Sequence, residues 1–287
     1  MTAQPTSGAG NPDQVEYWNA SAGDTWAALS DRLDRMVGPL GEVAMDALAL
    51  VGGEHVVDIG CGCGQTTLEL ARRIGEWGEV LGVDVSVPML AIARSRAALA
   101  GLSNVRFLES DAQVHAFEPR VADAVFSRFG VMFFSDPLAA FANIRTTLTP
   151  DGRLAFVCWR AMSENPMMTA PMAAALPFLP EPPAPPDPFA PGPFAFADRN
   201  RLSGILASAG FHDIEVTPND QPITTGDLEQ TIDLSMRIGP LGAILRERPD
   251  LQARVVDAIR EALIPLRTEA GVFFDSATWI VTARKEA

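Results

Sequence analysis

The sequence predicts an α/β fold in which a doubly wound, mostly parallel sheet is covered by helices on both faces. Two observations carry this prediction: short apolar runs alternate with longer amphipathic segments, and the first run leads into a glycine-rich turn. The expected strands lie at 54–59, 79–84, 104–109, 121–127 and 152–159. The expected helices between them lie at 64–74, 87–100 and 137–148.

The helix at 137–148 has the clearest boundaries. Asp136 is placed to cap its N-terminus, and Pro137 suits the first helical position because its missing N–H is not needed there. The run from Thr149 to Gly152 is expected to end the helix in a turn.

Composition divides the chain into a tail with a helical cover at 1–50, a core at 51–160, a proline-rich cap at 161–197 and the rest of the sheet at 198–287. Residues 1–12 are small and polar and indicate a loose tail, whereas the apolar spacing of residues 14–50 predicts helices. The last segment is expected to hold a helix at 201–209, a strand at 212–217 followed by a polar loop, helices within 227–268 broken near Gly239–Pro240 and Pro249, and a strand at 278–284.

The proline-rich segment holds 11 of the chain's 23 prolines between Pro166 and Pro193, which is expected to exclude most regular structure there. Methionines and phenylalanines are interleaved with these prolines, while serine and lysine are scarce. This composition favours an ordered cap over a flexible linker.

Composition also limits the class of function. The 287 residues are 47% hydrophobic and 20% charged, which is typical of a folded globular chain. With 22 basic and 36 acidic residues, the net charge of −14 disfavours nucleic acid and anionic membranes as partners and favours a small molecule. No apolar run approaches the roughly 20 residues of a membrane span, so membrane insertion is not expected.

The cysteines and the first residues predict a cytoplasmic protein. Met1–Pro12 has neither the basic nor the apolar region of a signal peptide, and three cysteines are too few and odd in number for a disulfide framework. Cys61, Cys63 and Cys158 are therefore expected to remain thiols. The spacing of Cys61 and Cys63 is too short for a zinc knuckle, so no metal is expected.

The glycine-rich turn is the most informative stretch, running from Val56 to Thr67 as V-V-D-I-G-C-G-C-G-Q-T-T. Glycines allow a ligand to approach the backbone closely, and the N–H groups at the start of the next helix favour an anion. Dinucleotide-binding folds use G-x-G-x-x-G here, but Gly60, Gly62 and Gly64 are spaced G-x-G-x-G, and Gln65 stands in the place of the last glycine. The turn therefore favours a ligand other than a dinucleotide.

Acidic and polar residues follow the next three expected strands. Asp84 ends the second strand, where a carboxylate can accept hydrogen bonds from both ribose hydroxyls. Asp111 follows the third strand and can accept from an adenine amino group, and Ser127 ends the fourth. Since parallel strands bind ligands at their carboxyl ends, these residues are expected to meet in one crevice.

The motifs D-I-G-C-G-C-G, D-V-S, S-D-A and S-R-F-G-V-M-F-F-S-D-P resemble those of class I S-adenosylmethionine-dependent methyltransferases. The small-molecule branch that includes the ubiquinone and menaquinone C-methyltransferases is most similar. The resemblance is specific over 54–160 and weak over 200–217 and 278–284. It implies a Rossmann-like sheet of seven strands with the seventh antiparallel, and S-adenosylmethionine as cofactor.

The resemblance also implies roles for individual residues. It places the glycine-rich turn along the methionine portion of S-adenosylmethionine, Asp84 on the ribose of this cofactor and Ser127 near its methionine amine. The implied cofactor-binding residues are Gly60, Cys61, Gly62, Gly64, Asp84, Val85, Met89, Asp111, Ala112 and Ser127.

Three aromatic residues of the N-terminal segment have two interpretations. Tyr17, Trp18 and Trp26 suit a plain core, but aromatics of an N-terminal helix also suit a cover over the donor, where a ring face attracts a sulfonium cation. On the second interpretation Tyr17 and Trp26 are counted as cofactor-binding residues.

Two residues are candidates for catalysis. His115 is near the expected crevice and suits either a general base or a solvated loop position, whereas alignment of the reactants alone can supply much of the acceleration. Arg160, at the end of the fifth strand, suits either a fork on a substrate carboxylate or a pair with one of the chain's many acids.

The sequence therefore predicts an enzyme that moves a methyl group to a small, largely apolar acceptor. The alternatives are an NAD(P)-dependent oxidoreductase on a related fold and a non-catalytic S-adenosylmethionine-binding regulatory protein. The sequence does not identify the acceptor or the atom that is methylated. It also leaves the oligomeric state open, and it is compatible with an oligomer.

Overall fold

The computed structural model describes residues 10–181 and 187–286. Residues 1–9 of the expected tail, residues 182–186 of the proline-rich segment and residue 287 lie outside the described residues. Among the helices of the described ranges, none is long and apolar enough to cross a membrane.

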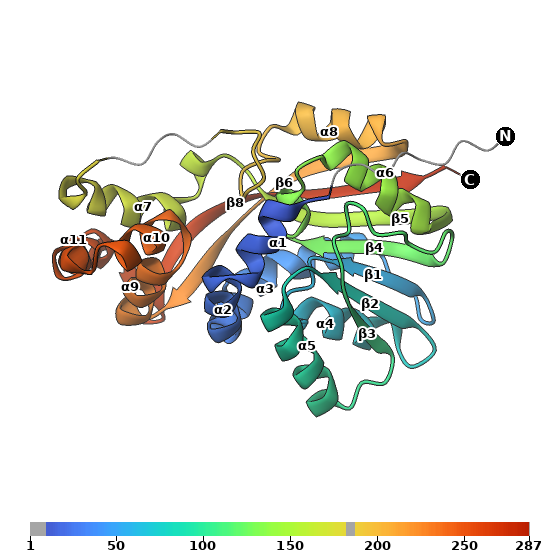
Figure 1. Ribbon diagram of the computed structural model, residues 1–287, viewed down its shortest axis with the longest axis horizontal. Helices are drawn as coiled ribbons and strands as arrows, with labels where there is room; N and C mark the ends of the chain where they lie inside the picture. The colour runs from blue at the N-terminus through green and yellow to red at the C-terminus, as the bar shows by residue number, and fades with distance from the viewer. Residues whose placement is uncertain (1–9, 182–186, 287) are drawn as a thin grey trace.

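One sheet organises the molecule (Figure 1). Its strands follow the order β3-β2-β1-β4-β5-β8-β6, with a short β7 beside β8. Strands β1 to β5 are parallel, and β8 is antiparallel to both of its neighbours, β5 and β6. The predicted α/β class and the antiparallel strand near the end of the chain are thus confirmed. The strands are β1 His55–Ile59, β2 Glu79–Asp84, β3 Val105–Glu109, β4 Ala122–Arg128, β5 Leu148–Trp159, β6 Phe211–Gly226, β7 Arg267–Thr268 and β8 Gly271–Lys285.

Helices cover this sheet and form a separate lobe. The N-terminal cover consists of α1 Pro12–Asn19, α2 Ser21–Ala28 and α3 Ser30–Ala47, and the core helices are α4 Gln65–Ile74, α5 Val87–Ala100, α6 Pro137–Thr147 and α8 Arg199–Ser208. In Figure 1 the helices α7, α9, α10 and α11 gather at the far end of the long strands β6 and β8. They are α7 Pro166–Ala175, α9 Leu228–Arg237, α10 Gly239–Glu247 and α11 Gln252–Leu263, so the predicted breaks near Gly239 and Pro249 are confirmed.

The start of α6 has the predicted cap. The Asp136 carboxylate accepts a hydrogen bond from Ala139 N–H at 3.0 Å, and Pro137 occupies the first turn. The predicted turn after the helix is wrong as a boundary, because β5 already begins at Leu148. Ala122 pairs with Leu148 and Ala124 with Arg153, so the extra residues of β5 bulge out of the ladder, and Asp151 takes a left-handed φ of 62° there.

The predicted polar loop after residue 217 is also wrong. Strand β6 continues to Gly226 and pairs with β8 beyond Pro218 and Pro222. Prolines favour turns in isolation, but β6 is the last strand of the sheet order and needs hydrogen-bond donors on one side only. The extended β6–β8 pair carries the helical lobe.

The proline-rich segment contains more regular structure than the sequence predicts. Pro166 stands at the first position of α7, where it costs no hydrogen bond, and Pro171 lies inside the helix. The helix packs on α10, α11 and β8. The expectation that prolines exclude regular structure is therefore wrong for Pro166–Ala175.

The C-terminal part of the same segment belongs to the core. The ring centroid of Phe196 lies 5.9 Å from that of Phe141 and 6.4 Å from that of Phe156, and 1% of Phe196 is exposed. Trp279 of β8 donates its Nε1–H to the carbonyl of Ala197 at 2.9 Å. Residues 194–197 therefore hold the segment to the sheet.

Truncation of Phe196 tests this anchoring. Phe196→Ala is expected to lower the free energy of unfolding by about 3–5 kcal/mol, because it leaves a cavity in the aromatic cluster. Phe178→Ala in the same segment is the matched control, since Phe178 is 37% exposed, and it should change stability by about 0.5 kcal/mol or less. Urea unfolding measures both, and equal losses would contradict the assignment.

Candidate functional site

The glycine-rich turn joins β1 to α4 at the carboxyl edge of the sheet. Gly60, Gly62 and Gly64 have positive φ angles of 68°, 54° and 81°, a region that residues with a Cβ rarely adopt. A Cβ on Gly60 would lie 2.6 Å from the Cα of Gly130, which follows β4. The two chain segments therefore meet backbone to backbone.

A buried carboxylate lies directly beneath this turn. Asp58 of β1 accepts hydrogen bonds at Oδ2 from the hydroxyls of Thr66 and Thr67, both at 2.7 Å, while its buried Oδ1 has no partner. Burial raises the pKa of Asp58 from 3.8 to about 6, although the two hydroxyls and the nearby Arg128 lower it. Asp58 belongs to the glycine-rich motif, but sequence reasoning assigned it no role. The feature that points to a role is its unpaired oxygen, which only the structure shows.

Asp84 lies beside the turn, as the sequence predicts. Its Oδ2 accepts from Gly62 N–H at 2.7 Å, and its Oδ1 accepts from Ser86 N–H at 2.8 Å. Burial raises the pKa of this carboxyl and outweighs these hydrogen bonds, which lower it. Met89 also reaches the turn, because a Cβ on Gly62 would lie 2.9 Å from its methyl group.

The thiols of the turn are buried and are not in a disulfide. Burial raises the pKa of Cys61 well above its usual range and that of Cys63 to about 11. Both therefore stay protonated at neutral pH and contribute shape and backbone groups to the turn, not reactive sulfur. The described residues hold no cluster of three or more potential metal ligands among His, Cys, Asp and Glu side chains.

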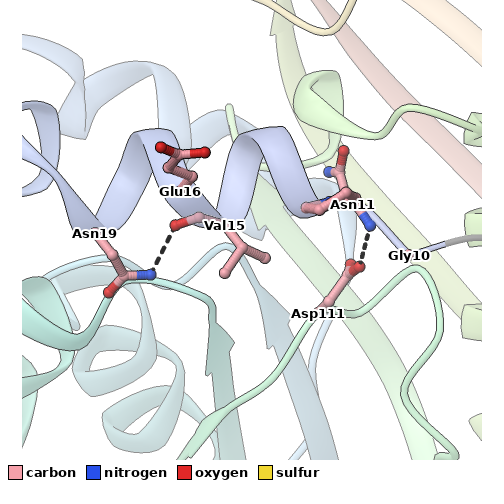
Figure 2. A pocket seen from close by; sticks show the side chains of 7 residues that line it. Gly10, Asn11, Val15, Glu16, Asn19 and Asp111 are labelled. Carbon is pink, nitrogen blue, oxygen red and sulfur yellow. Dashed lines mark hydrogen bonds between the residues drawn. The ribbon is translucent and has the colours of Figure 1, made fainter.

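Helix α1 lies across the ends of β2 and β3. At its start Asn11 N–H donates to Asp111 Oδ2 at 2.8 Å (Figure 2). At its end Asn19 Nδ2 donates to the carbonyl of Val85 at 2.8 Å. Ser86 Oγ also donates to the carbonyl of Trp18 at 2.8 Å. An open pocket of about 720 Å³ lies along this helix and is lined by Gly10, Asn11, Pro12, Val15, Glu16, Asn19 and Asp111.

The aromatic cover is centred on Trp18. Its ring makes edge contacts with those of Tyr17, Trp26 and Phe133, with centroids 5.1, 5.5 and 5.2 Å away. Tyr17 is half exposed at the outside of the cluster. Gln14, one helical turn before Trp18, has a buried Oε1 without a partner, which the sequence did not single out.

The predicted residues lie where four strands end. The glycine turn follows β1, Asp84 and Val85 lie at the end of β2, Asp111 and Ala112 follow β3, and Ser127 lies near the end of β4, while Met89 is in the first turn of α5. Their common ligand crevice stays a prediction. Ser127 is buried and accepts a hydrogen bond from Gly130 N–H at 3.2 Å. The site offers carboxylates, backbone N–H groups and an aromatic cover. This set suits a ligand that carries hydroxyl and cationic groups.

Residues 56–152 match the family model described as a methyltransferase domain. The chain is 34% identical over 144 residues to the aklanonic acid methyltransferase DauC of Streptomyces sp., a match that covers 50% of this chain and 60% of that protein. It is 39% identical over 111 residues to a demethylmenaquinone methyltransferase of Thermus thermophilus, covering 39% of this chain and 50% of the relative. These matches span less than two thirds of either relative.

A longer match is weaker in sequence. The O-methyltransferase cnsE of Penicillium expansum is 28% identical over 257 residues, covering 86% of this chain and 84% of that protein. Among solved structures, a Haemonchus contortus phosphoethanolamine N-methyltransferase in complex with S-adenosyl-L-methionine has a TM-score of 0.60 at 16% identity, covering 99% of this chain and 62% of that one. The [4+2]-cyclase SpnF has a TM-score of 0.56 at 20% identity, with both chains covered in full. The structural likenesses show that the fold is shared.

A partly buried ion network ties the helical cover to the region that matches the methyltransferase model. Arg128 at the end of β4 donates to Gln65 Oε1 and to Asp34 Oδ1 of α3, both at 2.6 Å. The other Asp34 oxygen accepts from Arg96 of α5 at 2.8 Å, and Arg96 also donates to the carbonyl of Cys63 at 3.0 Å. Asp34 therefore joins α3, β4, α5 and the glycine turn.

The two candidates for catalysis both have partners. Arg160 pairs with Asp220 at 2.8 Å and with Glu164, and its guanidinium lies 5.0 Å from the ring centroid of Trp279. His115 Nδ1 lies 2.9 Å from Ser110 Oγ, and its ring meets that of Phe117 edge-on. These contacts favour a loop position over a general base for His115, and an ion pair with acids of the chain over a substrate contact for Arg160.

Substitution of Asp34 tests the network. Asp34→Asn is expected to lower the free energy of unfolding by about 2 kcal/mol, because it leaves two guanidinium groups short of a partly buried counter-charge. Asp31→Asn is the matched control: Asp31 also pairs with Arg96, but its side chain is 81% exposed against 16% for Asp34. Asp31→Asn should lower the free energy of unfolding, measured with denaturant, by about 1 kcal/mol or less. Similar losses for the two variants would contradict the role of Asp34.

The pKa of Asp58 gives a prediction for stability against pH. Between pH 3.8 and about 6 the folded chain keeps the Asp58 proton while the unfolded chain loses it, so the contribution of Asp58 to stability falls as the pH rises through this window. Asp58→Asn removes this titration. Relative to the wild type, the variant should therefore gain on the order of 3 kcal/mol in unfolding free energy between pH 4 and pH 7. A difference that stays constant with pH would sink the assignment.

Proposed function

We propose that this chain is an S-adenosylmethionine-dependent methyltransferase that methylates a small, largely apolar molecule. The observation that carries the proposal is the junction of Asp84 with the glycine turn, inside a methyltransferase domain and at the carboxyl ends of parallel strands. Two relatives are named as methyltransferases of aklanonic acid and demethylmenaquinone, which favours a small-molecule acceptor. Their activity also favours methyl transfer over the oxidoreductase and regulatory alternatives.

The residues present fit this cofactor. Asp58 offers a buried carboxylate oxygen without a partner, which suits a cationic group such as an ammonium. Asp84 keeps acceptor capacity beside the turn for ribose hydroxyls, and Asp111 does so at the end of β3 for an amino group. When bound, such a cofactor supplies a methyl group on an electrophilic sulfonium sulfur.

The chain's own residues then act by holding and orienting. The glycine turn and Asp84 fix the donor pocket, while α1 and the aromatic cluster around Trp18 exclude water from one side of it. An acceptor that is itself acidic loses its proton to bulk water before it binds, so the site needs no general base. His115 holds Ser110 through Nδ1 and packs on Phe117, which suits a structural role. Positioning is thus the main contribution of this site to the rate.

The setting of the reaction follows from charge and thiols. We place the chain in the cytoplasm, a reducing compartment that suits its three buried free thiols. A net charge of −14 disfavours nucleic acid as the methyl acceptor. Recognition of a small, uncharged molecule avoids this repulsion.

Calorimetry of donor binding tests the function. The wild type should bind S-adenosylmethionine and bind NADP weakly or not at all, and it should release S-adenosylhomocysteine in a screen of apolar acceptors. Asp84→Ala should weaken S-adenosylmethionine binding tenfold or more, since about 1.4 kcal/mol of lost hydrogen bonding is a factor of ten.

Asp123→Ala is the matched control for Asp84→Ala. Asp123 likewise accepts from a backbone N–H, that of His55 at 2.9 Å, but at the opposite edge of the sheet. Its removal should leave donor affinity unchanged within about twofold. Equal donor affinity of wild type and Asp84→Ala would remove the ribose assignment, and a wild type that binds no donor would refute the function.

A further inference from the structure

Phe129, directly after β4, has an unusual backbone conformation. Its φ of 60° lies in the left-handed region, which is unfavourable for a bulky side chain because Cβ crowds the carbonyl. The backbone is held there by a hydrogen bond from Phe129 N–H to the carbonyl of Val157 at 3.0 Å. Such conformations persist where the surrounding structure enforces them, and they cluster at functional sites.

The side chain of Phe129 forms a flat stacked pair. Its ring lies 4.3 Å from that of Trp159, centroid to centroid, at an interplanar angle of 12°. Trp159, at the end of β5, is buried, whereas Phe129 remains partly exposed. Phe129 is therefore the more accessible residue of the pair.

The pair lies next to the proposed donor pocket. Phe129 is followed by Gly130, whose Cα approaches the position of a Gly60 Cβ to 2.6 Å. The same segment continues to Phe133, which contacts Trp18 of the cover. Phe129 thus stands between the glycine turn and the end of β5, at the carboxyl edge where parallel sheets bind their ligands.

We infer that Phe129 is the residue that orients the methyl acceptor, and that the acceptor carries a planar aromatic ring which stacks on it. This inference rests on the proposed function, because the ring next to the glycine turn is useful for methyl transfer only if the donor binds there. A rigid aromatic pair favours a flat ring over a saturated ring of similar size, since only the flat ring stacks at full contact. The pair also fixes the angle at which the acceptor meets the donor.

The test uses two probes with the same carbon skeleton, 2-naphthol, which is planar, and decahydro-2-naphthol, which is saturated. Calorimetry measures the affinity of the full chain for each probe, and the readout is the ratio of the two affinities. Stacking energies of aromatic pairs predict a preference for 2-naphthol of about three- to tenfold in the wild type. A general loss of folding lowers both affinities and leaves this ratio unaffected.

Three variants separate stacking from packing. Phe129→Tyr retains a ring and should keep the preference, whereas Phe129→Leu keeps an apolar side chain and should reduce it to within about twofold. Phe189→Leu is the matched control, because Phe189 is 60% exposed and its ring contacts Arg201 elsewhere on the surface. This control should behave as the wild type.

The outcomes distinguish the inference from the function on which it rests. A preference that survives in Phe129→Leu, or a wild type without any preference, overturns the role of Phe129 even if S-adenosylmethionine binds. A wild type that prefers 2-naphthol but binds no S-adenosylmethionine overturns the proposed function, and with it the assignment of the planar-ring site to an acceptor. Donor binding together with a preference that Phe129→Leu abolishes supports both.

Discussion

The backbone contact between Gly60 and Gly130 is the constraint on which the rest of the site depends. With no side chain on either residue, the turn after β1 and the segment after β4 come within van der Waals distance. The contact brings the segment that contains Phe129 to the turn that follows Asp58, and Gly62 of the same turn bonds to Asp84. A side chain on either glycine would separate the ends of β1 and β4 and with them the groups that we propose bind and orient ligands.

The helical cover is part of this site and not an independent element. Helix α1 bonds to Asp111 and Val85, which follow the third and second strands, and Asp34 of α3 bonds to arginines of β4 and α5. The cover therefore uses the strand ends that the proposed donor also uses. On the proposed function, donor binding and the position of the cover would be coupled through these shared groups.

Sequence reasoning predicted the parts of the molecule that local patterns determine. The alternation of apolar and helical segments predicted the positions of β1 to β5 along the chain, and spacing placed Asp84 at the end of the second strand, where it accepts from Gly62. Sequence reasoning could not predict contacts between residues that are distant in the chain. Pro218 indicated a loop until its edge position in β6 was known, and the roles of Asp58 and Asp34 depend on unpaired oxygens and on residues distant in the chain.

The pairing of the arginines also limits the chemistry of the acceptor. Arg128 is neutralised by Asp34, and Arg160 by Asp220 and Glu164, so neither guanidinium at this edge offers an unmatched positive charge to a substrate carboxylate. An anionic acceptor would have to displace a protein carboxylate in a chain that already carries a net charge of −14. On the proposed function, recognition of the acceptor would therefore fall to apolar and aromatic surface, which agrees with an acceptor held by the shape of its ring and not by charge.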